Sequence, residues 1–247
     1  MTIHLLRFDP DLARFAAWCA AENLVPRHNE DDGYAWHALL VATFGKAMAP
    51  KPFRVLARRG RPVQLLAYAS ADAAALRAHA ADFADPKTIG ALGVDSLASK
   101  PMPAFASGRR LGVSARLRPI VRTDRDGDRT KSREIDVYMA AKLKAETGLP
   151  IDRAQVYIEW ARARLIAAGV EVESLRLDGS EGAGVVRRTS PRADGTRPLV
   201  RISGNAITTI GTIRVFDADL FAATVANGLG RHRAFGYGML LLSPPEG

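Results

Sequence analysis

The order of strand-like and helix-like patterns along this chain restricts the folds that it can adopt more than any other feature. Residues 2–8 alternate apolar and polar side chains, as a half-buried strand does. Asp9 and Pro10 then suit the N-cap and the first position of a helix that runs to about Asn23. The same criteria predict further elements up to residue 98: a helix at 34–44, a strand hairpin at 52–58 and 62–69, a helix at 71–83 and a strand near 93–98.

The second part of the chain follows the same order with additions. It contains, in turn, a predicted strand within 109–122, a charged loop at 124–134, helices at 133–147 and 152–169, strands at 170–178, 184–190, 198–203 and 206–216, a helix capped by Asp217 and ended by Gly228, and a last strand at 238–244. Both parts therefore read β-α-β-β-α-β, the second with an extra hairpin. We predict an α+β fold of two tandem ferredoxin-like (RRM-like) domains, residues 1–100 and 101–247, from element order alone.

The charge balance favours a polyanionic partner. The 247 residues include 35 Lys and Arg against 26 Asp and Glu, for a net charge of +9. Nucleic acid is the simplest such partner, and a solvated basic surface is the alternative. Cys19 is the single cysteine, which excludes an intramolecular disulfide, and the five histidines show no zinc-binding spacing. We therefore expect no metal or cofactor, no membrane partner and a cytoplasmic location.

Arginines concentrate in two regions of the second part. Arg116 and Arg118 lie two residues apart, so they share one face of the predicted strand. Arg187, Arg188 and Arg192 surround the tip of a predicted hairpin. The planar guanidinium can bind two phosphate oxygens at once, and a basic hairpin can follow the backbone of duplex RNA. For any single arginine a solubilising role is the simpler explanation, but the cluster favours nucleic acid.

A glycine-rich stretch precedes the last predicted strand. It places Gly228, Gly230, Gly236 and Gly238 around the basic residues Arg231, His232 and Arg233. Glycine permits positive φ and close approach of the backbone, so such a loop can present N–H groups to phosphate. A helix C-cap followed by a tight turn is the alternative, and it accounts for only some of the glycines.

Tyr34 and His37 are the candidate catalytic pair. They lie three residues apart in "YAWHALL", on one face of the predicted helix. Imidazole titrates near neutral pH and is the usual general acid or base. The pattern alone, however, is more typical of packed or partly exposed side chains than of a catalytic pair.

Several of these motifs, taken together, resemble one family. The C-terminal "GLGRHRAFGYGMLLLSP", the helix "YAWHALL", "PKPFRVLAR", "LLAYASAD", "LRPIVR", "SREIDVYMAA" and the hairpin "VVRRTSPRADG" resemble, in order and spacing, the CasE-type endoribonucleases of type I-E CRISPR systems. These belong to the repeat-associated RNA-binding proteins, and the resemblance covers nearly the whole chain.

The resemblance implies a function for the candidate residues. It implies metal-independent cleavage of the repeat stem-loop in precursor CRISPR RNA by attack of a ribose 2′-hydroxyl, with the product retained in an effector complex with other subunits. His37 would be the general acid or base, Tyr34 its partner, and the hairpin and glycine-rich loop would bind RNA. Family members often carry a lysine or serine on the next helical turn, where this chain has Val41, Ala42 and Thr43. An arginine or Lys46 would then supply the charge that stabilises the transition state.

Two alternatives stay open at this point. The chain could be a non-catalytic RNA-binding subunit of a CRISPR complex, or a processing nuclease of another CRISPR type. A generic RNA-binding domain of the RRM class is disfavoured, because aromatic residues form only 7% of the chain and base stacking needs them on the sheet.

Overall fold

The computed structural model describes residues 2–25, 31–57, 59–125, 128–145, 150–188, 194–196, 198–202 and 204–245. For residues 123–125, 128–133, 186–188 and 199–201 only the backbone is described. Within these ranges, no helix combines the length and the apolar character that crossing a bilayer requires.

The first sheet has the split β-α-β arrangement of a ferredoxin-like domain. It consists of β1 (His4–Phe8), β2 (Phe53–Leu56), β3 (Gln64–Ala69) and β4 (Ala98–Pro101), in the order β2-β3-β1-β4. Strand β3 lies between β1 and β2, the two strands that helices connect, and every neighbouring pair is antiparallel.

The second sheet repeats this arrangement. It consists of β5 (Arg110–Leu117), β8 (Val170–Gly182), β11 (Asn205–Val215) and β12 (Leu240–Ser243), in the order β12-β5-β11-β8. Strand β11 lies between β5 and β8, again with antiparallel neighbours. The predicted fold, two tandem ferredoxin-like domains, is confirmed. The first sheet ends at Pro101 and the second begins at Arg110.

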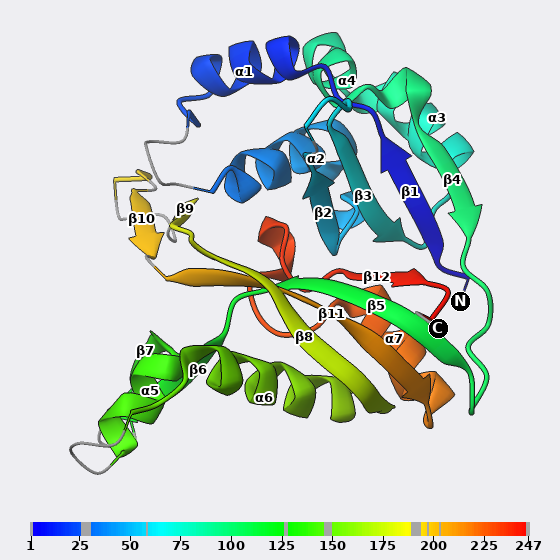
Figure 1. Cartoon of the computed structure of the whole chain (residues 1–247). Coiled ribbons are helices and arrows are strands. Elements are labelled where there is room, and N and C mark those ends of the chain that lie inside the picture. The colour runs from blue at the N-terminus through cyan, green and yellow to red at the C-terminus, as the bar shows by residue number, and fades with distance from the viewer. Residues whose placement is uncertain are drawn as a thin grey trace.

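Helices cover each sheet, and Figure 1 shows the two halves one above the other. The helices of the first half are α1 (Leu12–Ala21), α2 (Gly33–Met48), α3 (Ala73–Phe83) and α4 (Pro86–Leu92), followed by the short 3₁₀ turn η1 (Val94–Ser96). Those of the second half are α5 (Val137–Lys144), α6 (Arg153–Ile166) and α7 (Ala218–Asn227), with the 3₁₀ turn η2 (Arg233–Phe235). Two hairpins are added to the second half, β6 (Ile120–Arg125) with β7 (Asp128–Asp136), and β9 (Val185–Arg188) with β10 (Leu199–Ile202).

Several predicted boundaries were wrong, each for a local physical reason. Asp11, not Asp9, caps α1, because its carboxylate accepts hydrogen bonds from the Ala13 and Arg14 N–H groups. The predicted loop at 124–134 is largely strand, because the backbone of β7 pairs with β6. The predicted strand at 109–122 is two strands, which Pro119 separates. Helix α4 was missed, and the strand expected near 93–98 begins at Ala98.

Each sheet packs its own apolar core against its helices. In the first half Leu6 and Phe8 of β1 are fully buried against Trp36 of α2. In the second half Ile213 of β11 is fully buried against Phe221 of α7. Tyr68 of β3 joins the two, because it packs in the second core and its hydroxyl donates to the Leu240 carbonyl oxygen at 2.8 Å.

Candidate active site

The start of α2 lies at the junction of the two halves. The Asp31 carboxylate accepts a hydrogen bond of 2.6 Å from the Gly33 N–H, which the first turn of a helix leaves without a partner. Gly33 itself contacts the second half so closely that a Cβ there would meet the Phe235 carbonyl oxygen. Tyr34 and His37 follow on the first two turns and are both half-buried. The structure therefore holds the candidate pair where the two domains meet.

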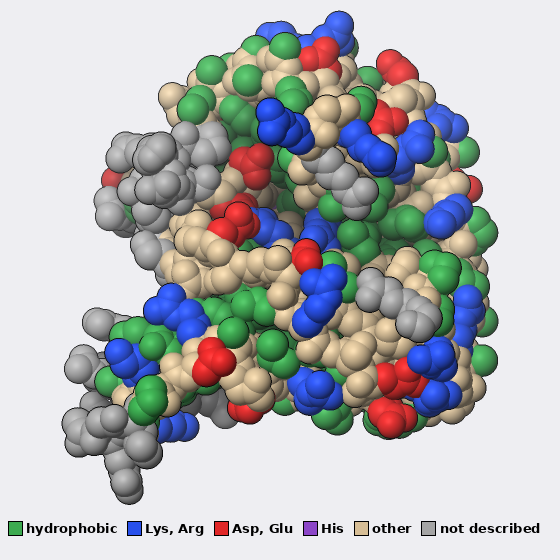
Figure 2. All heavy atoms as spheres, in the orientation of Figure 1, with side chains coloured by type: hydrophobic (Ala, Val, Ile, Leu, Met, Phe, Trp, Pro, Cys, Tyr) green, Lys and Arg blue, Asp and Glu red, His purple; other side chains and the backbone are tan. Residues whose placement is uncertain are grey.

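Phe235 from η2 contacts both members of the pair. Its ring centre lies 5.6 Å from that of His37, edge-on at 81°, and 5.9 Å from that of Tyr34. The three side chains line an open cavity of about 770 Å³, together with Lys46 and Glu22. Lys and Arg side chains are visible in the hollow between the two halves in Figure 2. Sequence analysis missed Phe235, because one aromatic residue among glycines carries no pattern.

The glycine-rich stretch forms the loop that presents Phe235. The Leu229 N–H donates to the Gly238 carbonyl oxygen at 2.7 Å, and the Gly238 N–H donates to the Arg116 carbonyl oxygen at 2.8 Å. Gly228 and Gly238 have φ of 79° and are buried, and a Cβ on Gly238 would meet the Leu229 carbonyl oxygen. Gly236 is also buried, with φ of 83°, whereas Gly230 is exposed. The buried glycines thus allow the two ends of the loop to pack closely against each other. RNA binding by the four glycines stays a prediction.

The basic side chains of this loop already have protein partners. Arg231 and His232 bind the Glu134 carboxylate, at 3.0 and 2.9 Å. Burial alone would raise the pKa of Glu134, but these two neighbours lower it below its usual value. Arg233 donates to the Asn227 carbonyl oxygen at 3.0 Å. Arg231 and Arg233 remain exposed, so they can still meet an anion.

A second cavity is also lined by Phe235. Its volume is about 750 Å³, and its lining includes Lys51, Arg122, Arg231 and Arg233 besides Phe235 itself. Four cationic side chains thus border the ring that contacts His37. Such a cavity has the charge that a phosphate group requires.

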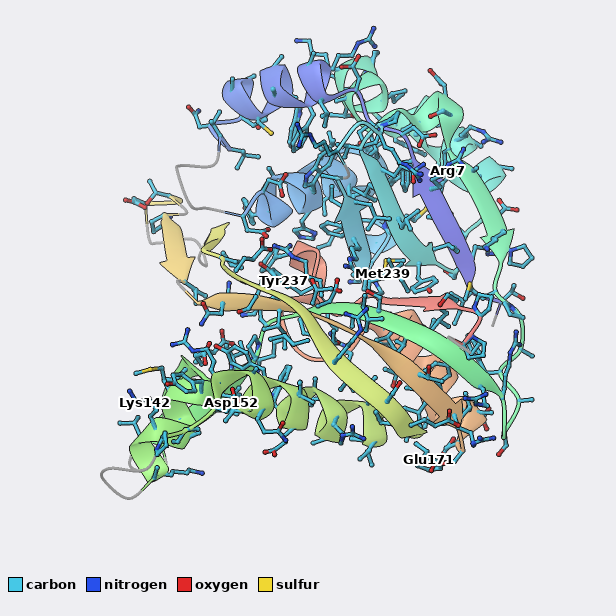
Figure 3. All side chains as sticks on the ribbon, viewed as in Figure 1. Arg7, Lys142, Asp152, Glu171, Tyr237 and Met239 are labelled. Atoms are coloured by element: carbon cyan, nitrogen blue, oxygen red, sulfur yellow. The ribbon has the colours of Figure 1, made fainter. Side chains whose placement is uncertain are left out.

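A buried network ties α2 to the second half. Asp31, whose side chain is 6% exposed, accepts from the Arg116 guanidinium at 2.8 Å and from the Tyr237 hydroxyl at 3.0 Å. Arg116 also binds the exposed Glu181 at 2.7 Å. Burial alone would lower the pKa of Arg116, but Asp31, Tyr237 and Glu181 together outweigh burial and raise the pKa above its usual value. Figure 3 shows Tyr237 between the two halves. The network sets the position of the candidate catalytic helix.

Arg118 is buried, whereas its place in a basic strand suggested an exposed side chain. Arg116 and Arg118 do share a face, since both guanidinium groups lie over the Tyr237 ring, at 4.7 and 5.8 Å. Arg118, however, is only 1% exposed, and its Nη2 donates to the Ile202 carbonyl oxygen at 3.3 Å. Its Nε and Nη1 have no hydrogen-bond partner among the described residues, and burial lowers its pKa. Arg118 is therefore an interior side chain and Arg116 belongs to the network, and RNA binding by these two arginines stays a prediction.

The basic hairpin exists as expected, although its tip lies outside the described residues. Strands β9 and β10 pair in antiparallel register, with Arg187 opposite Val200 and Arg188 opposite Leu199. Arg192 falls in the tip, at a residue that the structure does not describe. Phosphate binding by these three arginines stays a prediction.

The environment of His37 favours its neutral form. Burial lowers its pKa below the usual 6.5, and the positive charge of Lys51 lowers it further. A neutral imidazole at pH 7 can accept a proton. Lys51 lies just after α2 and before β2, and sequence analysis did not select it because its relation to His37 is made only by the fold.

Comparison with known proteins gives the family. A family model described as CRISPR associated protein matches residues 3–244. This chain belongs to that family. The match spans both ferredoxin-like domains and confirms the family resemblance that the sequence motifs indicated. No curated protein matches the sequence.

Solved structures agree with this assignment in fold. The Thermus thermophilus Cse3 bound to an RNA representing a pre-cleavage complex has 17% identity and a TM-score of 0.65, over 99% of this chain and 100% of that one. A structure of CRISPR endoribonuclease Cse3 bound to a 19-nucleotide RNA has 18% identity and a TM-score of 0.64, with the same coverage. The CRISPR-associated protein Cas6e from Escherichia coli K-12 has 18% identity and a TM-score of 0.52, again over 99% and 100%. These proteins share the complete two-domain fold of this chain.

Proposed function

We propose that this family member is an endoribonuclease that cuts the stem-loop repeats of precursor CRISPR RNA and stays bound to its product in an effector complex in the cytoplasm. The observation that carries the proposal is the placement of Tyr34 and His37 at the domain junction, half-buried beside Phe235 and next to a cavity with four cationic side chains. Cse3 and Cas6e, which have the same fold, support the choice of substrate.

In the proposed reaction a ribose 2′-hydroxyl attacks the adjacent phosphate. His37, kept neutral by burial and by Lys51, takes the proton of that hydroxyl. The 2′-oxygen–phosphorus bond forms, the bond from phosphorus to the 5′-oxygen breaks, and the leaving oxygen takes a proton from the Tyr34 hydroxyl. The products are a 2′,3′-cyclic phosphate and a 5′-hydroxyl. The nucleophile belongs to the RNA, and its proton goes to a side chain, so we propose a metal-independent reaction.

Binding of the stem would rest on shape and charge. The deep major groove of A-form RNA hides the base edges, so arginines there chiefly meet phosphates. We assign this contact to the β9–β10 hairpin, with Arg187, Arg188 and Arg192, and to the exposed Arg231 and Arg233 beside the candidate site. Arg231 would exchange part of its contact with Glu134 for a phosphate oxygen.

The proposal is tested with a labelled repeat hairpin, all-ribose or with one 2′-deoxy sugar at the scissile position, in EDTA. We expect wild type to cut only the all-ribose RNA, and His37→Ala to bind it without cutting, with a loss of about 10²–10⁴-fold in rate. His79→Ala is the matched control, because that imidazole contacts the Phe44 carbonyl oxygen near the C-terminal end of α2 and does not line the cavity of His37. If wild type binds both RNAs and cuts neither, the chain is a non-catalytic binding subunit.

A further inference from the structure

The proposed reaction needs a positive charge that α2 does not provide next to His37. Attack on a phosphodiester adds negative charge to the two non-bridging oxygens, and a fixed cation beside them is worth a large part of the rate. The turn after His37 carries Val41, Ala42 and Thr43, none of which is charged. Lys46 lies nine residues beyond His37, after a break in the helix at Gly45, and lines the first cavity. A cation from another element is the alternative to Lys46.

Lys51 is the cation that the fold brings to this position. It is exposed in the segment between α2 and β2, and it lines the second cavity with Phe235, whose ring contacts His37. Its charge reaches His37 strongly enough to help lower the pKa of that imidazole. Lys46 has no such effect on His37, although it lines the first cavity.

Lys51 also differs from Arg231 and Arg233, two other cations of its cavity, in having no competing contact. Arg231 binds Glu134 at 3.0 Å, and Arg233 donates to the Asn227 carbonyl oxygen. Among the described residues, Lys51 makes neither a hydrogen bond nor an ion pair. Its ammonium group can therefore bind a phosphate without first breaking a contact within the protein.

We propose that Lys51 is a catalytic residue, whose ammonium group contacts a non-bridging oxygen of the scissile phosphate and stabilises the charge that develops there during 2′-hydroxyl attack. The scissile phosphate then lies beside Phe235, between His37 and Lys51. This assignment rests on the proposed function and adds the residue that the sequence pattern lacked. It also gives Lys51 a second effect, since its charge helps keep His37 neutral.

Two kinds of measurement test the assignment, both with the full-length protein. The first is the single-turnover cleavage rate of the repeat hairpin at saturating enzyme, with the Kd measured separately on the 2′-deoxy RNA. We expect Lys51→Met to lower the rate about 10²-fold, with a much smaller change in Kd, and Lys51→Arg to recover part of the rate. Lys100→Met, on exposed β4, is the matched control and keeps the wild-type rate.

The second measurement is the pKa of His37 in the free protein, by NMR titration. The titratable and charged groups around this imidazole are Tyr34 and Lys46 on α2, Glu22 and Asp85 across the first cavity, and Lys51, Arg122, Glu134, Arg231, His232 and Arg233 in the second cavity. Since Lys51 disfavours a second positive charge, Lys51→Met raises the pKa of His37 and Lys100→Met leaves it unchanged. A slow Lys51→Met variant with a raised His37 pKa and a normal circular dichroism spectrum supports the proposal.

Three results overturn it. If wild type cuts and Lys51→Met cuts equally fast, the assignment of Lys51 fails and the proposed function stands. If Lys46→Met loses the rate and Lys51→Met does not, the cation is on α2. If Lys51→Met loses affinity for the 2′-deoxy RNA but keeps its rate at saturation, Lys51 only binds RNA. If wild type cuts no repeat RNA, the proposed function itself fails.

Discussion

Replacing Asp31 with Asn tests whether the buried network holds the domains together. The change keeps the size of the side chain but removes the charge that compensates Arg116. Asp31 is 6% exposed and Arg116 is 23% exposed, and Asp31 also accepts from Tyr237 and from the Gly33 N–H. The variant therefore leaves a largely buried guanidinium with only the exposed Glu181 as an acidic partner.

The expected cost follows from this burial. Breaking one side of a buried ion pair costs about 3–5 kcal/mol of unfolding free energy. Because Arg116 is partly exposed and some hydrogen bonds survive, we expect Asp31→Asn to lower the unfolding free energy by about 3 kcal/mol, the lower end of this range. For a chain of this size each kcal/mol lowers Tm by about 2–4 °C, so we expect a fall of roughly 6–12 °C.

Thermal unfolding followed by circular dichroism measures this, with Glu181→Gln as the matched control. Glu181 binds the same guanidinium at 2.7 Å, but its side chain is 62% exposed, so its loss should cost less than about 1 kcal/mol. Equal destabilisation by the two variants would refute the reasoning, because burial would then not decide the strength of the pair. If Asp31→Asn lowers Tm by less than about 3 °C, the estimated cost is refuted.

Three further predictions follow from the site. If neutral His37 is the base, as proposed, its lowered pKa should keep the cleavage rate on its plateau to below pH 6.5 before the rate falls. A midpoint above 6.5 in the pH–rate profile would contradict this. Gly238→Ala should cost about 3 kcal/mol in denaturant unfolding, because φ is 79° and the new Cβ meets the Leu229 carbonyl oxygen. Gly108→Ala, with φ of 82° and open space, should cost about 1 kcal/mol. Affinity for the repeat hairpin should fall steeply with salt, and Arg187→Ala should reduce the slope of log Kd against log salt by about 1; an unchanged slope would remove this arginine from the interface.

The sequence was sufficient to predict the order of elements in both domains. Strands such as β1, with Leu6 and Phe8 buried and Arg7 exposed, follow the two-residue period that a half-buried strand requires. The helix start at Asp217 was also predictable, because its carboxylate accepts from the Leu220 N–H in the usual capping geometry. Strand β7, which pairs with β6, was not predictable. Charged residues occur along its whole length, so its sequence has no apolar period of the kind that marks a strand.

The candidate site was predictable only where its residues are close in sequence. Tyr34 and His37 share a helix face, so their spacing in the sequence is enough to predict that they lie together. The partners that place them are distant: Asp31 is 85 residues from Arg116 and 206 from Tyr237. Arg118 was misplaced for the same reason, since an arginine at a strand end resembles a surface residue until the fold puts Tyr237 and Ile202 around it. Lys51 likewise has no sequence pattern that relates it to His37.

The contact between Phe235 and α2 also affects when activity can arise during synthesis. A ribosome releases the helix with Tyr34 and His37 early, and the loop with Phe235 only after most of the second domain. Until then the imidazole lacks the ring that packs against it, and the Asp31 carboxylate lacks Tyr237. The proposed catalytic site is thus assembled only after most of the second domain has been synthesised. Under the proposed function, cleavage activity therefore arises only after both domains have been synthesised.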